Sequence, residues 1–439
     1  MTREAGECHV ASSAAAVRLV HVTSAAFHSM KSILIITRLD YRREPHQRFH
    51  QQVRYWAPRV ERVTVLFRRW NTGRSLRELW RALFTFRTDV TREGPVQLVE
   101  VDPPWNLPRG FGVTYIGFLQ DFIDLVSMFA AFMWRVREPF DVCVGVGPYG
   151  VMVGQWLKRW GLVSHLVYDD IDYEPGFYFN WRFRRWYHVL MEKYCLRRAD
   201  VFVTVGRQLA DVRREQTEKT VHLVPNGVDY TSFAAAQHKS PHPPTLIYTG
   251  NVACWHSGLD VAIEAMPAIL RELPEARLLI IGGAGPADEA GLRQRVVELG
   301  LAEHVQLLGA KPYAALPQYL RDADIGLAVF PPNEVRSYAV PCKVFEYMAA
   351  GLAIVTTRGT ESARIVSDAD CGELIEHTPM DFARAVVALF RRPDVLKRYA
   401  ENAARESRDC DWRVLMEREL ALVDASFATE RSTMSCAVG

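Results

Sequence analysis

The chain alternates short apolar runs with longer helical stretches, and it does so in two separate series. The first series holds strand-like runs such as SILIIT at 32–37, VCVGVG at 142–147 and VFVTV at 201–205. The second series begins with TLIYTG at 245–250 and ends with GELIE at 372–376. Parallel strands need a crossover of helical length, so this alternation is typical of parallel sheets covered by helices. The sequence therefore predicts an α/β protein with two Rossmann-like, doubly wound domains facing a cleft.

Length agrees with this division, because 439 residues exceed what one compact core usually holds. The segment 234–244, AAAQHKSPHPP, is small, polar and proline-rich, and we expect an inter-domain linker there. It would separate a first domain at 30–233 from a second domain at 245–410. Residues 411–439 contain one further helix and a tail.

Charge and cysteine content exclude several classes of protein. A net charge of +2 does not favour nucleic acid as a partner, and eight scattered cysteines without a CxxC pair fit a reducing compartment. No uncharged apolar run is long enough to span a bilayer; the nearest, 122–134, contains Asp124. Residues 1–29 lack the clean apolar region of a signal peptide. We expect a disordered extension there, and a functional start near Met30.

The stretch VPCKVFEYMAAG at 340–351 leads from a proline-rich loop into a short helix. Pro341 suits a first helical turn, and Gly351 suits a helix end. Lys343 and Glu346 then lie in the first turns, at the kind of place where open α/β sheets bind ligands. A helix N-terminus and a Lys favour phosphate, and a Glu accepts hydrogen bonds from sugar hydroxyls. An ordinary surface pair at i,i+3 is the alternative.

This stretch resembles the nucleotide-binding segment of GT-B glycosyltransferases, especially family 4, in which P-x-K-x-F-E-Y-M-A-x-G precedes a strand. The string VPNGVD at 224–229 resembles the same family. The resemblance extends from Ser32 to about Trp412. It implies that Glu346 holds the ribose of a sugar nucleotide and that Lys343 lies near its phosphates. It also implies that the last helix packs back on the first domain.

Glycine-rich strand ends of the second domain complete the donor site that the resemblance implies, because glycine permits close backbone approach to a phosphate or base. We place these donor contacts at Gly250, Asn251, Gly282 and Gly283. Members of the family commonly carry an Arg and a Lys where this chain has Asn251 and Ser257. We therefore expect Lys343, helix N-termini or Arg336 to meet the diphosphate charge.

A second acidic residue of the family, eight positions before Glu346, is absent. That position is Tyr338, and the nearest acid is Glu334. The departure leaves open which sugar is bound and whether the anomeric configuration is retained.

The first domain should hold the acceptor. An acidic cluster at a strand end, which includes Asp170 and Asp172, can raise one pKa and produce a base near neutral pH. If the reaction inverts the anomeric centre, either aspartate is the candidate base. If it retains, the leaving phosphate serves and the aspartates only position substrate. A merely solvated acidic loop is an equal alternative.

Basic and aromatic residues mark further candidate contacts in the first domain. Arg38, Arg42 and Arg43 follow the first strand and suit a donor phosphate or an anionic lipid diphosphate, unless the loop is simply solvated. Tyr149 lies in a glycine-rich loop that can shape the acceptor pocket. The segment 177–187, FYFNWRFRRWY, can lie on an anionic membrane surface or pack on the sheet as an amphipathic helix.

Together these features predict a metal-independent glycosyltransferase without a cofactor. Its donor would be a UDP or GDP sugar and its acceptor a glycan or a lipid-linked molecule; no nucleic acid is expected. The sequence Asp322-Ala323-Asp324 spells a D-x-D metal motif but precedes a strand, so we expect no metal site. The resemblance implies polysaccharide or envelope biosynthesis in the cytoplasm, peripherally on the inner face of a membrane. A non-catalytic GT-B subunit and a sugar-nucleotide epimerase on the same fold are the alternatives.

Overall fold

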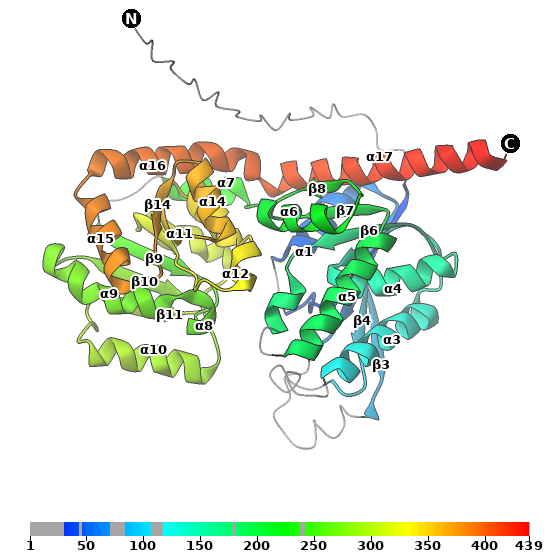
Figure 1. Cartoon of the computed structure of the whole chain (residues 1–439), viewed down its shortest axis with the longest axis horizontal. Coiled ribbons are helices and arrows are strands. Elements are labelled where there is room, and N and C mark those ends of the chain that lie inside the picture. Colours follow the sequence, from blue (N-terminus) through cyan, green and yellow to red (C-terminus); the bar gives the residue numbers. More distant parts are fainter. Residues whose placement is uncertain are drawn as a thin grey trace, which may run out of the picture.

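The computed structural model describes residues 30–43, 46–70, 84–106, 117–178, 181–237 and 242–438, which form two α/β domains (Figure 1). The prediction of two doubly wound domains is confirmed, since each holds a largely parallel sheet enclosed by helices. The predicted extension at 1–29 lies outside the described residues.

The first domain contains a sheet in the order β3-β4-β2-β1-β5-β6-β7-β8, and only β3 pairs antiparallel with its neighbour. Its strands are β1 (Ser32–Thr37), β2 (Arg62–Arg68), β3 (Arg87–Glu93), β4 (Val96–Asp102), β5 (Phe140–Val146), β6 (Val163–Asp170), β7 (Val201–Thr204) and β8 (Val221–Leu223). Its helices are α1 (Arg48–Trp56), η1 (Ala57–Arg59), α3 (Gly117–Arg135), α4 (Gly147–Arg159), η3 (Glu174–Tyr178), α5 (Arg182–Arg198) and α6 (Arg207–Gln216).

Both faces of this sheet are buried, which explains why its strands read as continuous apolar runs. Leu34 and Ile36 pack with α3, α4 and α5, whereas Ile33 and Ile35 pack with α1 on the other face. The strand order reverses between β1 and β5. Ligands of open α/β sheets bind at such a switch point, outside the carboxyl ends of the strands.

The second domain has the strand order β11-β10-β9-β12-β13-β14, all parallel, so its switch point lies between β9 and β12. The strands are β9 (Thr245–Thr249), β10 (Arg277–Ile281), β11 (Val305–Gly309), β12 (Ile325–Ala328), β13 (Ala353–Thr357) and β14 (Gly372–Ile375). The helices are α7 (Tyr230–Ala234), η4 (Ala235–Gln237), α8 (Cys254–Ser257), α9 (Leu259–Glu272), α10 (Pro286–Glu298), η5 (Tyr313–Ala315), α11 (Leu316–Arg321), α12 (Glu334–Tyr338), α13 (Cys342–Ala349), α14 (Glu361–Asp368), α15 (Pro379–Phe390), α16 (Pro393–Glu406) and η6 (Ser407–Cys410).

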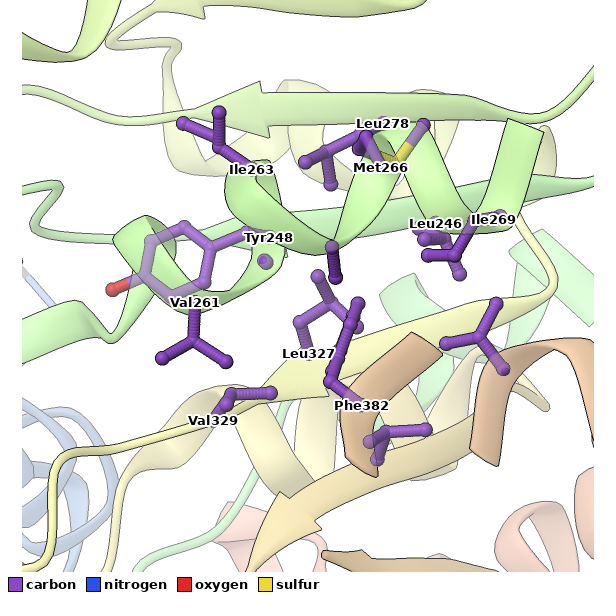
Figure 2. Packing of buried hydrophobic residues seen from close by; sticks show 14 of the residues in the cluster. Leu246, Tyr248, Val261, Ile263, Met266, Ile269, Leu278, Leu327, Val329 and Phe382 are labelled. Atoms are coloured by element: carbon purple, nitrogen blue, oxygen red, sulfur yellow. The ribbon is translucent and has the colours of Figure 1, made fainter. Parts of the chain in front are cut away.

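One face of the second sheet packs against α9 and α15. Figure 2 shows Ile263 and Met266 of α9 beside Leu246 and Leu278 of the sheet, and Phe382 of α15 belongs to the same cluster. All five side chains are almost wholly inaccessible to solvent. This packing fixes the strands whose carboxyl ends form the candidate site.

Part of the segment predicted as a linker is helical and belongs to the second domain. Phe233 and Ala236 are fully buried there, and the Gln237 amide donates a hydrogen bond of 2.9 Å to the Ala349 carbonyl. The alanines that read as a small-residue linker are instead strong helix formers packed on α13. The linker prediction for 234–237 is therefore wrong.

The chain passes between the domains at two places that lie side by side. Val228 pairs in parallel with Asp411; its N–H donates to the Cys410 carbonyl at 3.0 Å, and its own carbonyl accepts from Trp412 at 2.9 Å. Gly227 fits here because a side chain would overlap the Cys410 carbonyl.

The last helix, α17 (Trp412–Val438), packs back on the first domain, as the resemblance implies. Met416 and Leu420 are fully buried against α1, and Trp56 Nε1 donates to the Met416 carbonyl at 2.9 Å. Arg48 of α1 is buried beside Glu419 of α17 and bonds Asp169 at 3.0 Å. This buried ion-pair group fixes α17 to the first sheet.

Among the described residues, α3 is the helix that is long and apolar enough to cross a membrane by length and composition. Half of its most apolar window is buried, and Asp121 and Asp124 are ion-paired inside the domain. We therefore regard α3 as a helix packed on the sheet with one face outward.

Candidate functional site

Helix α13 is anchored to the end of β9, which brings the predicted ribose and phosphate contacts to the switch point. The Tyr347 hydroxyl accepts a hydrogen bond of 2.8 Å from the Thr249 N–H, and Tyr347 is fully buried. Its ring lies against Gly326 so closely that a side chain there would overlap it. The helix N-terminus therefore points to the loops after β9 and β12.

Lys343 carries a buried ammonium that makes no hydrogen bond to the described residues. Its Nζ lies 3.8 Å from the centroid of the Tyr248 ring, and a Cβ built at Gly250 would lie 2.8 Å from it. Burial, followed by the positive charge of Arg336, lowers the pKa of Lys343 to about 7. A buried cation that no carboxylate hydrogen-bonds is costly, which favours an anion at this place.

Arg336 brings a second positive charge to the same place from α12. Its side chain is 8% exposed, and its guanidinium lies 5.3 Å from the centroid of the Phe330 ring. The buried Nε has no hydrogen-bond partner among the described residues. Burial and the charges of Arg336 and Lys343 lower the pKa of His256 to about 3, so that imidazole is neutral. Lys343 and Arg336 thus supply the charge that Asn251 and Ser257 cannot.

Glu346 is 6% exposed and lies one turn beyond Lys343. Burial raises the pKa of its carboxyl to about 7, against the opposing effects of a hydrogen bond with Tyr313 and the charge of Lys343. Tyr313 in turn stacks on His46 of the first domain, with ring centroids 4.1 Å apart. A carboxylate held in this way can accept hydrogen bonds from two hydroxyls of a ribose.

The glycines predicted to let a phosphate or base approach the backbone are needed first for contacts within the protein. Gly282, at φ 153°, lies against the carbonyl of Gly250, and a side chain there would overlap it. Gly250 itself, at φ 120°, leaves room for Lys343. Asn251 Oδ1 accepts from the Ala253 N–H at 2.9 Å and so closes its own loop. Gly283 lies next to Glu289, whose carboxylate accepts from the Ala284 N–H at 3.1 Å.

The two candidate bases of the first domain have different environments. Asp170 is fully buried, and both of its oxygens accept from Arg213, at 2.9 and 3.1 Å. Both carboxylate oxygens are thus occupied inside the first domain, and this geometry corrects the assignment of Asp170 as a base. Burial raises the pKa of Asp172 to about 6, while Arg336 across the cleft acts in the opposite direction. Of the two aspartates, Asp172 is therefore the one whose charge interacts with the second domain, through Arg336.

Arg38 does not present a free charge for a phosphate. It pairs with Asp121 at 3.1 Å and with Asp124 at 2.8 Å, and its guanidinium lies 3.9 Å from the centroid of Tyr149. Tyr149 is 4% exposed and its hydroxyl lies 3.4 Å from His188 Nε2, so the tyrosine supports Arg38 rather than lining an open pocket.

The other two predicted arginines are also engaged. Arg42 donates to Thr91 at 2.8 Å, and Arg43 donates to the Trp70 carbonyl at 2.9 Å. The prediction of Arg38, Arg42 and Arg43 as phosphate contacts is corrected, because each is already bonded within the first domain.

Glu174 was missed by the sequence reasoning. Burial raises the pKa of its carboxyl to about 8, although Arg38 acts against this, and Oε1 lies 3.9 Å from the position a Cβ would take at Gly147. Glu174 lies two positions after Asp172, so its place next to the acidic cluster is the feature of the sequence that could have indicated it.

Glu334, the acid nearest to the missing family position, is bound by Arg185 of α5. Arg185 Nη2 lies 2.8 Å from Glu334 Oε1, and Nη1 bonds the other oxygen. Tyr338, which occupies the expected position, packs on Tyr173 of the first domain with ring centroids 5.0 Å apart.

The aromatic and basic segment 177–187 has two sides. Arg184 and Arg185 face inward to Asp121 and Glu334, whereas Phe183 and Trp186 are 66% and 57% exposed. The described part of the segment therefore packs on the domain through its arginines, and the membrane contact stays a prediction.

The described parts of the chain contain no group of three His, Cys, Asp or Glu arranged to hold a metal ion. In the D-x-D sequence, Asp324 accepts from the Thr245 N–H at 2.9 Å, next to the start of β9. Its carboxylate therefore braces a strand start at the edge opposite the site.

Residues 243–392 match the family model described as Glycosyl transferases group 1. The phosphatidyl-myo-inositol mannosyltransferase of Mycobacterium tuberculosis is 30% identical over 200 residues, which are 44% of this chain and 50% of that protein. The chain thus spans about half the length of this curated relative.

Solved structures resemble nearly the whole fold at low identity. Sucrose-phosphate synthase from Thermosynechococcus elongatus aligns with a TM-score of 0.69 and 18% identity, over 91% of this chain and all of that one. HepE from Anabaena, solved in complex with UDP, aligns with a TM-score of 0.62 and 16% identity, over 90% of this chain and all of that one. These likenesses confirm the two-domain GT-B architecture.

Proposed function

From a chain that has the GT-B fold and a second domain matching the glycosyl transferases group 1, we propose a glycosyltransferase that uses a nucleoside diphosphate sugar. The observation that carries the proposal is the pair of buried cations, Lys343 and Arg336, with no hydrogen-bond partner on Nζ and Nε among the described residues. They converge at the switch point of the second sheet, beside a glycine-rich strand end. Diphosphate would supply the missing negative charge.

In this proposal the second domain binds the donor and stabilises the leaving group. Glu346 accepts hydrogen bonds from the ribose, while Lys343 and Arg336 neutralise charge that grows on the diphosphate as the glycosidic bond breaks. Two fixed cations in a site of low polarity provide such stabilisation without a metal ion. The reaction is therefore proposed to be metal-independent.

The first domain is proposed to align the acceptor across the cleft. If the configuration inverts, Asp172 takes the proton of the acceptor hydroxyl, since its raised pKa suits a base near neutral pH. If the configuration is retained, the leaving phosphate takes that proton and Asp172 positions the acceptor.

A lipid-linked acceptor is proposed because the first domain presents an apolar surface. We call the outward side chains of α3 and α5 the aromatic face; they are Phe118, Leu119, Phe122 and Val126 of α3, and Phe183, Trp186 and Leu190 of α5. Phe118 and Phe183 meet with ring centroids 6.4 Å apart, so the two helices form one surface. The name of the mycobacterial relative, a phosphatidyl-myo-inositol mannosyltransferase, supports an acceptor at a membrane.

Charge on the aromatic face suits an anionic membrane on the cytoplasmic side. The acids of α3 and α5, which are Asp121, Asp124 and Glu192, are all buried in the described structure. Arg182 and Lys193 of α5 are exposed. Basic and aromatic side chains without exposed acids favour anionic lipid surfaces.

The proposal is tested by thermal melting with UDP, GDP and ADP, followed by transfer assays. A ligand at about one hundred times its Kd adds roughly 2.7 kcal/mol to stability. We expect one nucleotide to raise the Tm in the parent protein and not in the Glu346→Ala variant. Its sugar nucleotide should then add one sugar mass to a lipid or glycan acceptor. If a nucleotide stabilises the protein but neither a heavier acceptor nor an epimerised donor is found, a non-catalytic subunit is favoured. If the donor is epimerised and no acceptor gains mass, an epimerase is favoured.

A further inference from the structure

The helix that carries Arg336 is held by the first domain as well as by its own. Helix α12 spans only Glu334–Tyr338, and its N-cap Asn333 accepts from the Arg336 N–H at 3.0 Å. Such a short helix has little stability of its own, so its neighbours decide where its side chains point. Those neighbours include η3 and α5 of the first domain.

Three side-chain contacts with η3, α5 and the residue before η3 help to join α12 to the first domain. Glu334 forms a two-point ion pair with Arg185 of α5. Val335 packs on η3 so tightly that a Cβ at Gly176 would lie 3.1 Å from its Cγ2. Tyr338 packs on Tyr173. The Glu334–Arg185 pair is the directional one, because a two-point carboxylate–guanidinium pair fixes orientation as well as distance.

Arg336 needs such support, since nothing in the described second domain neutralises it. Its charge interacts unfavourably with that of Lys343, and the carboxylate that acts on it with opposite charge is Asp172 of the first domain. A buried guanidinium in this position would move away from Lys343 if its helix were free to shift.

We propose that Arg185 and Glu334 are positioning residues which hold Arg336 in place for the diphosphate of the donor. This proposal rests on the proposed function and adds that the acceptor domain sets the affinity of the donor domain for diphosphate. The same pair accounts for the loss of a free acid near the sugar, because the Glu334 carboxylate is occupied by Arg185.

The test compares a nucleoside diphosphate with its nucleoside, because only the nucleotide carries the diphosphate charge that Arg336 would bind. Kd values for UDP and uridine, and in parallel for GDP and guanosine, are measured by calorimetry on the full chain. We expect Glu334→Gln and Arg185→Met each to weaken the diphosphate about fivefold or more, a normal coupling between sites, and to change nucleoside affinity less than twofold. A Glu334→Gln change made in an Arg336→Met background should have no further effect.

A matched control is the Arg59–Glu417 pair, which joins η1 to α17 with a similar exposure of 38% and 40%. Glu417→Gln should leave both affinities unchanged. Equal losses for nucleotide and nucleoside, or additive effects of Glu334→Gln and Arg336→Met, would overturn the positioning role while leaving the donor site intact. Absence of nucleotide binding by the parent protein would instead overturn the proposed function and this inference with it.

Discussion

The ammonium nitrogen of Lys343, in α13, lies 3.8 Å from the centre of the Tyr248 ring, in β9, and no carboxylate is bonded to that nitrogen in the described structure. A ring face attracts a cation by about 1 to 2 kcal/mol when both are desolvated, which is less than the cost of burying the charge. The lysine is therefore held at the expense of stability.

Replacing this lysine should change stability and binding in opposite directions. We expect Lys343→Met to raise the free energy of unfolding by about 1 kcal/mol, as removal of strained functional groups often does, and to abolish the thermal shift given by UDP or GDP. Denaturant unfolding and melting measure the two effects. Lys31→Met is the control, because Lys31 is exposed and paired with Glu61, and it should change neither by much. A less stable variant would mean that Lys343 is compensated in the free protein.

Nucleotide affinity should depend on pH around neutrality. The pKa of Lys343 lies below its ordinary value, at about 7, so above pH 7 the free protein loses the charge that diphosphate needs. We expect UDP or GDP affinity to fall by up to tenfold per pH unit above 7, with proton uptake on binding at pH 8. Calorimetry in buffers of different ionisation enthalpy measures that uptake.

Below pH 7, the pH dependence of ligand affinity should reflect protonation of Glu346. Its pKa is raised to about 7, so its carboxylate becomes neutral as the pH falls below 7. Uridine or guanosine, which lack phosphate, should therefore bind more weakly at pH 6 than at pH 8. In Lys343→Met this acid fall for uridine or guanosine should persist, because the nucleosides carry no phosphate for Lys343 to bind. A flat profile for both ligands would contradict the assigned roles.

Asp172 and Asp170 should separate catalysis from folding. We expect Asp172→Asn to lower the transfer rate by about a hundredfold or more if the reaction inverts, with nucleotide affinity little changed. Asp170→Asn removes one half of a buried ion pair with Arg213 and should lower the free energy of unfolding by about 3 kcal/mol. Steady-state kinetics and denaturant unfolding distinguish the two. Full activity in Asp172→Asn would assign proton transfer to the leaving phosphate.

Replacing Arg48, the buried arginine of α1 that pairs with α17, should cost more stability than replacing most other residues. Arg48 bonds Asp169 and Glu419 and donates to the carbonyls of Val224 and Pro225, each at 3.0 Å. Arg48→Met leaves Asp169 and Glu419 buried without a cation, although Gln52 still donates to both, and we expect a loss of about 3 to 5 kcal/mol in unfolding free energy. Exposed Arg54→Met should cost less than 1 kcal/mol by the same urea titration.

The aromatic face should bind anionic vesicles. We expect a Phe183→Ser, Trp186→Ser double variant to lose most of its sedimentation with vesicles containing phosphatidylglycerol, while keeping its nucleotide-dependent thermal shift. Met380→Ser, an exposed apolar residue of the second domain, should sediment as the parent does. Equal sedimentation of all three proteins would remove the aromatic face as the membrane contact.

Features set by neighbours in the sequence were predictable. The helix after Pro341, with Lys343 and Glu346 on its first turns, follows from capping residues and periodicity within about ten positions. The strand ends at Gly250 and Gly282 follow from the same kind of local pattern. The structure places all of them at one switch point, as the alternation of strands and helices implies.

Features set by distant partners were not predictable in the same way. The charge of Arg38 is met by Asp121 and Asp124, more than eighty positions away, and that of Glu334 by Arg185, 149 positions away. A single sequence shows which charges exist but not which of them neutralise one another. For that reason the loop with Arg38, Arg42 and Arg43 was predicted to be a phosphate site. For the same reason the sequence did not show that the helix carrying Arg336 is bound by Arg185 of the other domain.

The two passages of chain between the domains, paired at Val228 and Asp411, have a mechanical consequence. One connecting segment would let the domains rotate in any direction, whereas two paired segments form a hinge that restricts the rotation. Bending across their line remains easy, while twisting about the long axis of the molecule strains both at once. A rotation confined to such a hinge would keep Asp172 opposite Arg336 whenever the two domains meet.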